Sequence, residues 1–86
     1  MTGKSTLLGI QIRMARHALR WSVRELSARS SVSTSTIVRA EADDGIPRTT
    51  KANLKALRLT LETAGIEFTG GPEDGPGVRV RPAAKA

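Results

Sequence analysis

Residues 21–41 read WSVRELSARSSVSTSTIVRAE and decide the fold of this chain. The stretch holds two short amphipathic segments, each opened by a serine. In the first segment, Ser22 and Glu25 form the sequence pattern of a capping box, in which each side chain accepts a hydrogen bond from a free N–H group at the start of a helix. Trp21 and Leu26 stand at the two positions of a hydrophobic staple, so we expect them to pack together.

The second segment repeats this design, with Ser33 as the N-cap and with Val32 and Ile37 as the staple. Ser31 lies in the turn between the segments, at a position that commonly needs the left-handed backbone conformation, which costs a non-glycine residue about 1 kcal/mol. Two capped helices joined by so short a turn predict a helix-turn-helix unit, whose second helix is presented to a partner.

Apolar residues at helical spacing continue on both sides of this unit. The pattern predicts four helices, over residues 5–19, 22–30, 33–42 and 50–64, with Leu59 off the buried stripe of the last one. Residues 66–69 alternate in the manner of a strand, and residues 78–81 alternate again. The second run could pair with the first within the chain or across a dimer, or it could stay disordered, and the sequence leaves these alternatives open.

The length of 86 residues allows one small domain. We expect residues 1–4 to be disordered, residues 5–69 to form the helix-turn-helix domain, and residues 70–86 to be a Gly/Pro-rich tail with the candidate strand at 78–81. Because aromatic residues make up only 2% of the chain, its core must rest on Leu, Ile, Val and Ala, with Trp21 and Phe68 as anchors.

The formal net charge of +6 favours an anionic partner, nucleic acid first, although many small domains are basic for solubility alone. The chain lacks cysteine, which excludes disulfides and thiolate metal sites. His17 stands alone, and no spacing matches a metal site, paired catalytic carboxylates or a Ser–His–Asp triad, so we expect no metal, no cofactor, no small-molecule substrate and no enzyme. The sequence shows neither a membrane-spanning run nor a secretion signal, so we expect a cytoplasmic protein.

Four segments resemble the helix-turn-helix of the lambda-repressor-like, XRE-type regulators: Glu25–Arg29, Val32–Ser33, Thr36–Ile37 and Arg39–Glu41. The resemblance covers about residues 12–68. It implies an all-α fold, a compact domain of four to five helices, with a short β-hairpin or a disordered tail at the C-terminus. It also implies an ion pair between Arg16 and Glu41, which ties the first helix to the third and is structural rather than base-reading. Fold alone does not settle function.

The resemblance assigns the base-reading positions to Thr34, Ser35, Val38 and Arg39. Of these four side chains, only Arg39 can make two hydrogen bonds to one base. The short hydroxyls discriminate bases weakly, and Val38 can at most touch a thymine methyl group. The reading set is therefore poor for a DNA-binding protein.

The phosphate side departs from the family in the same direction. Val23 stands where relatives commonly carry a phosphate-binding glutamine, and Asp43-Asp44 stand where they often carry glycine and basic residues. Two carboxylates beside phosphates would repel them. Arg48 and Lys51 remain as candidate phosphate contacts.

An apolar patch with a charged rim could form on this face, from Val23, Val38 and Trp21 with Arg24, Arg39 and Asp43 around them. Such a patch suits a protein partner better than a duplex. The alternative is that the two valines are ordinary scattered surface residues.

Two functions follow, and both place the protein in negative control of transcription. The preferred one is an antiactivator, which binds a transcriptional activator protein and blocks it; the chain looks similar to the small single-domain antiactivators of bacterial mobile elements, whose targets include quorum-sensing and conjugative-transfer activators. The alternative is an operator-specific repressor that reads the major groove of double-stranded DNA with Ser33–Arg39.

Overall fold

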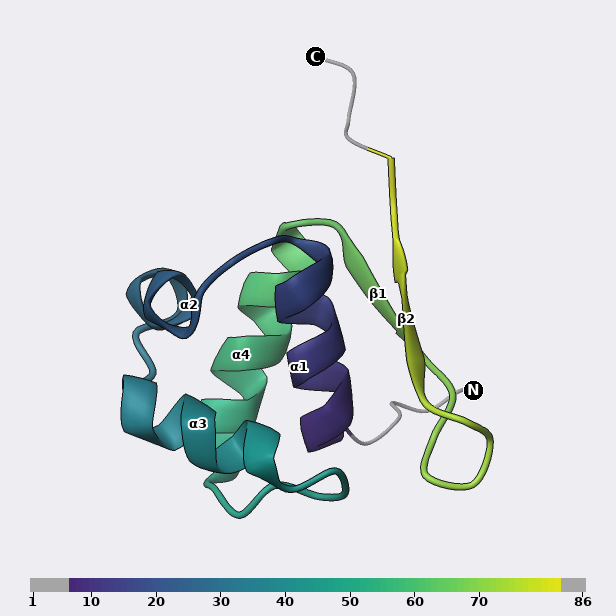
Figure 1. Ribbon diagram of the computed structural model, residues 1–86, viewed down its shortest axis with the longest axis horizontal. Coiled ribbons are helices and arrows are strands. Elements are labelled where there is room, and N and C mark those ends of the chain that lie inside the picture. The colour runs from purple at the N-terminus through teal and green to yellow at the C-terminus, as the bar shows by residue number, and fades with distance from the viewer. Residues whose placement is uncertain (1–6, 83–86) are drawn as a thin grey trace.

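The computed structural model describes residues 7–82, and Figure 1 shows their arrangement. Four helices, α1 (Gly9–Ala18), α2 (Val23–Ser30), α3 (Thr34–Ala42) and α4 (Lys51–Thr63), are followed by the strands β1 (Ile66–Thr69) and β2 (Gly77–Val80). α1 and α4 lie in the middle, with α2 and α3 on one side and the two strands on the other (Figure 1). The predicted all-α class is therefore wrong, because the described chain combines four helices with a two-stranded antiparallel sheet.

The core collects apolar side chains from every helix and from β1. Its buried members are Leu7, Ile12, Ala15, Leu26, Val32, Ile37, Ala40, Leu57, Leu61 and Ile66. Trp21 and Phe68, the two aromatic anchors expected from the sequence, are partly buried and pack against this cluster. Each fully buried Leu or Ile stabilises the fold by about 1.5–3 kcal/mol, so the few in this core decide whether so small a domain folds.

The two serine caps of the helix-turn-helix unit are confirmed. Ser22 Oγ accepts a hydrogen bond from the Glu25 N–H at 3.0 Å, and Ser33 Oγ accepts one from the Thr36 N–H at 3.2 Å. The Glu25 carboxylate, however, accepts a bond from Arg29 Nε at 2.7 Å instead of reaching back to Ser22 as the predicted capping box requires. The Glu25 carboxylate thus bonds to an arginine one turn further along the helix and not to the backbone N–H of Ser22.

Ser31 has the left-handed backbone expected of it, with φ of 65°. Arg20 also lies in this region, with φ of 61°, which the sequence did not indicate. It ends α1 in a Schellman motif, because the Trp21 N–H donates to the Arg16 carbonyl at 3.0 Å and the Arg20 N–H donates to the His17 carbonyl at 3.0 Å. This turn reverses the chain and brings Trp21 to the entrance of α2.

Helix α1 begins at Gly9, later than the predicted start at Ser5, which lies outside the described residues together with the expected disordered segment 1–4. Leu8 is extended, and its N–H donates to the Gln11 side chain at 3.1 Å. The Gly9 N–H donates to the Gly45 carbonyl at 2.8 Å, and a Cβ at Gly9 would overlap the carbonyl oxygens of Ala40 and Asp43. The start of α1 therefore touches the end of α3 backbone to backbone, which only glycine permits.

The two strands pair within the chain, which decides among the three alternatives that the sequence left open. β1 and β2 run antiparallel, with Phe68 opposite Val78, and the second strand occupies residues 77–80 rather than 78–81. Gln11 is fully buried, and its Nε2 donates to the carbonyls of Thr69 at 2.9 Å and Gly77 at 3.0 Å. One amide group of α1 thus holds both strands where the hairpin opens into its loop.

Replacing Gly9 with alanine should destabilise the domain by about 1–3 kcal/mol, because the new methyl group must push α1 away from the end of α3. Urea unfolding followed by circular dichroism measures this loss. Gly71→Ala is the matched control, since a Cβ there meets nothing within 4 Å. Equal stabilities of the two variants would show that the close approach at Gly9 is not a constraint on the fold.

Replacing Gln11 with alanine should loosen the hairpin more than the helices, because both strand carbonyls lose their shared donor. We expect the hairpin amides of the variant to exchange their hydrogens faster than those of the unaltered protein, while the amides of α4 stay equally protected. Asn53→Ala removes an amide that only reaches Thr49 at the start of α4, and it should leave hairpin exchange unchanged. Uniform acceleration over the whole chain in the Gln11 variant would contradict a local role.

Candidate functional site

The outer face of α3 brings four predicted contact residues together. Thr34, Ser35, Val38 and Arg39 are all exposed, and they form two adjacent pairs four positions apart, which places them on one side of the helix. The opposite side of α3 is buried in the core through Ile37 and Ala40. We call these four exposed residues the α3 face.

The α3 face is chemically sparse. Val38 is 56% exposed and has no polar atom in its side chain. The Ser33 hydroxyl caps the helix and lies 2.8 Å from Thr36 Oγ1 and 3.4 Å from Ser35 Oγ, so part of its hydrogen-bonding capacity is used locally. Arg39 alone among the four carries several donors in a fixed planar fork. The face therefore offers two short hydroxyl groups, one apolar contact and one guanidinium.

The start of α2 contributes less apolar surface than the sequence suggested. Arg24 is exposed, but Val23 is half-buried and packs against the core. Trp21 lines a hollow with residues of α4, and Val38 does not line it. Of the three apolar residues of the predicted patch, only Val38 is fully exposed, because Val23 and Trp21 pack partly against the core.

The acidic loop after α3 is less repulsive than its sequence implies. Arg13 Nη2 pairs with Asp44 at 2.8 Å, and the same guanidinium donates to the Glu41 carbonyl. Asp43 accepts a hydrogen bond from the Gly45 N–H at 3.1 Å and remains exposed. One of the two carboxylates therefore carries its own counter-charge.

The candidate phosphate contacts lie around the start of α4. Arg48 precedes this helix, Lys51 is its first residue, and both are exposed. The Thr50 hydroxyl caps the helix by accepting a hydrogen bond from the Asn53 N–H at 3.0 Å. The two cations are therefore anchored beside an ordered helix start and are open to an anionic partner.

The ion pair between Arg16 and Glu41 is present as the resemblance implied. Arg16 Nε lies 2.7 Å from Glu41 Oε2, and Arg16 Nη2 lies 2.8 Å from Oε1, so the pair is bidentate. Both side chains are largely buried, and Arg16 Nη1 also donates to the Trp21 carbonyl at 3.0 Å. The hydrogen bond to Glu41 raises the pKa of Arg16 above its ordinary value. Arg16 is thus a structural residue that holds α3 and the start of α2 against α1.

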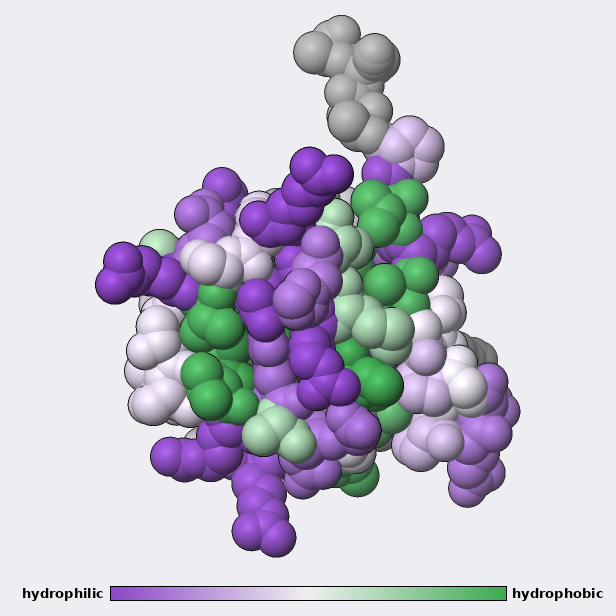
Figure 2. All heavy atoms as spheres, in the orientation of Figure 1, coloured by the Kyte–Doolittle hydropathy of each residue, from purple (hydrophilic) through white to green (hydrophobic). Residues whose placement is uncertain are grey.

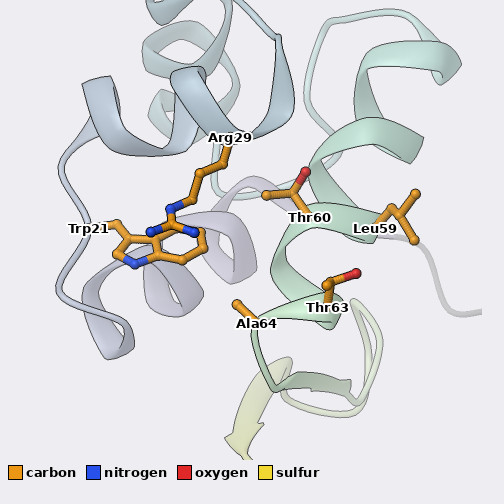
Figure 3. A pocket seen from close by; sticks show the side chains of 6 residues that line it. All are labelled: Trp21, Arg29, Leu59, Thr60, Thr63 and Ala64. Atoms are coloured by element: carbon orange, nitrogen blue, oxygen red, sulfur yellow. The ribbon is translucent and has the colours of Figure 1, made fainter.

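Sequence reasoning missed a hollow between α2 and α4, which Figure 3 shows from close by. It has a volume of about 470 Å³, and we call it the α2–α4 groove; its lining residues are Trp21, Arg29, Leu59, Thr60, Thr63 and Ala64. The Arg29 guanidinium lies over the Trp21 ring, 4.4 Å from the ring centre. The position of Leu59 off the buried stripe was the available signal, and the side chain is 64% exposed.

Apolar surface is not confined to this region. Figure 2 shows a hydrophilic column over the central helices, with hydrophobic surface toward α2 and α3 on one side and over the hairpin on the other. Within residues 7–82, no group of three or more His, Cys, Asp or Glu side chains is placed to hold a metal ion. In the same part of the chain, no helix is long and apolar enough to cross a membrane.

Comparisons with family models, curated proteins and solved structures gave no match to this chain.

Removing the carboxylate of Glu41 should destabilise the domain by about 3–5 kcal/mol, because Arg16 stays charged and buried without its partner. Urea unfolding of Glu41→Ala measures the loss. Glu25→Ala breaks an exposed pair with Arg29 and should cost less than about 1 kcal/mol.

The double variant Arg16→Met with Glu41→Leu should recover much of the stability lost in Glu41→Ala, because it removes both charges from the interior. A double variant as unstable as the single one would mean that the pair itself, rather than the orphaned charge, carries the energy.

Proposed function

We propose that the chain is an antiactivator of transcription on an XRE-type helix-turn-helix scaffold, which binds a transcriptional activator protein and blocks it. The activator class is that of quorum-sensing or conjugative-transfer systems of bacterial mobile elements, as the resemblance implies. The observation that carries the proposal is the composition of the α3 face. This face exposes Val38, and Arg39 is its one side chain able to make two hydrogen bonds to a base.

The chemistry of this face suits a protein better than a duplex. Sequence-specific readers rely on bidentate side chains aimed at base edges, and DNA affinity rises with the number of phosphate contacts. Val38 offers neither, and Val23 fills the position at the start of α2 where a phosphate ligand would stand. An exposed valine next to an exposed arginine, Arg39, instead matches the apolar centre and polar rim of a small protein interface, and Arg24 is a further exposed cation at the start of α2.

An operator-specific repressor is the second candidate, and two observations favour it. Asp44 is neutralised by Arg13, and Arg48 and Lys51 are exposed beside the start of α4. In this function, the segment Ser33–Arg39 would read the major groove, and a dimer would be needed to match a palindromic operator. Either function would be exercised in the cytoplasm and needs no cofactor.

The deciding experiment titrates ¹⁵N-labelled protein with duplex DNA from its own promoter region at physiological salt, and separately tests co-purification with activators encoded by the same element. We expect no sequence-specific amide shifts with DNA and a stable complex with an activator. Micromolar or tighter specific DNA binding centred on α3, with no activator complex, would establish the repressor instead.

The variant Val38→Glu should weaken the activator complex about tenfold or more while leaving the fold intact, because the side chain is exposed and lies at the centre of the α3 face. Val80→Glu is the matched control, since this valine is 51% exposed on β2, away from α3. Loss of the complex in both variants, or in neither, would place the activator elsewhere.

A further inference from the structure

The α2–α4 groove exposes apolar side chains that do not belong to the buried core. Leu59 is 64% exposed, and the ring of Trp21 is only partly buried by the core. In Figure 3, Trp21 and Arg29 lie on one side of the hollow, Thr60 and Ala64 lie nearest to them on the α4 side, and the side chain of Leu59 points away from Trp21 at the outer edge. No residue of α3 lines it, so it is separate from the α3 face.

The α4 wall has the spacing of a helix-binding surface. Leu59 with Thr63, and Thr60 with Ala64, are pairs four residues apart, so the wall extends over one full helical turn. An amphipathic helix laid in such a hollow presents its own apolar side chains at the same spacing. A Trp and an Arg in the opposite wall are the residue types that most often dominate protein interfaces.

One cation lines the groove, and two more precede its lining residues in the chain. Arg29 sits above the Trp21 ring, Arg20 precedes Trp21 and is exposed, and Lys55 is exposed one turn before Leu59 on α4. The carboxylates near this region already have cationic partners.

Those carboxylates are Glu25, which pairs with Arg29 at 2.7 Å, and Glu62, which pairs with Arg58 at 3.1 Å. A ligand helix with acidic flanks would therefore meet cations beyond those that the protein's own carboxylates use. A basic one would be repelled.

We propose that the α2–α4 groove binds an acidic amphipathic helix of the target activator, as a docking surface additional to the α3 face. This inference rests on the proposed function for the identity of the partner, but the groove can be tested without it. The apolar side chains of the ligand helix pack against Trp21 and Leu59, and its carboxylates meet Arg20 and Lys55, the exposed cations that the ion pairs of Glu25 and Glu62 do not use.

Trp21 is the only tryptophan of the chain, so its fluorescence reports on the groove directly. The probe is a synthetic helical peptide of about 18 residues with leucine at positions i, i+4 and i+7 and glutamate at the remaining exposed positions. A second peptide keeps the leucines and carries lysine in place of glutamate. We expect the acidic peptide to shift Trp21 emission saturably and the basic one to leave it unchanged.

Leu59→Glu tests the contact, because an exposed residue can be replaced without disturbing the core. Ile46→Glu is the matched control, since Ile46 is 62% exposed in the loop between α3 and α4, and this residue does not line the groove. We expect Leu59→Glu to weaken peptide binding about tenfold or more and Ile46→Glu to leave it unchanged. Equal affinity in both variants, preference for the basic peptide, or displacement of the acidic peptide by duplex DNA would overturn the inference.

The activator complex separates this inference from the proposed function. If Val38→Glu abolishes the complex while Leu59→Glu leaves it unchanged, the antiactivator stands and the groove is not a docking surface for the activator. If no activator binds but the acidic peptide binds in a manner that depends on Leu59, the proposed function fails and the groove still takes an acidic helix. Weakening of the complex by each variant separately supports both.

Discussion

The buried ion pair between Arg16 and Glu41 fixes the position of the presented helix. Its two short bonds hold α1 against α3, and the third donor of Arg16 reaches the Trp21 carbonyl at the entrance of α2. One guanidinium on α1 thus contacts both helices of the helix-turn-helix unit, and it is charged at every physiological pH. Such a pair contributes little net stability, because desolvation offsets the attraction, but it penalises any arrangement that separates the partners.

Helix α1, which carries Arg16, also contacts the rest of the molecule. Gly9 lets its first turn touch the backbone at the end of α3, Gln11 holds both strands of the hairpin, and Arg13 pairs with the loop after α3. These contacts are polar or backbone contacts, and they surround a core that has few large side chains. In a domain this small, directional contacts from one central helix supply the specificity that a larger core would supply by shape.

What could be predicted from the sequence was local or carried by the resemblance. The caps at Ser22 and Ser33 act within three residues, so their pattern is visible in the sequence, and the Arg16–Glu41 pair came with the XRE-type resemblance. The roles of Gly9 and Gln11 depend on segments more than thirty residues away. No local pattern encodes such contacts, which is why the pairing of the hairpin stayed open and the all-α class was wrong.

The groove was not predicted because its lining also comes from distant parts of the sequence, Trp21 and Arg29 on one side and α4 on the other. Trp21 packs against the core on one side and lines the groove on the other, so a ligand that covers the groove also covers a core anchor. Any ligand that binds only the folded state stabilises it by mass action, and the effect matters most where the core is thin. The groove and the α3 face also share no residue, so one activator that engaged both would gain affinity from the high effective concentration of the second contact.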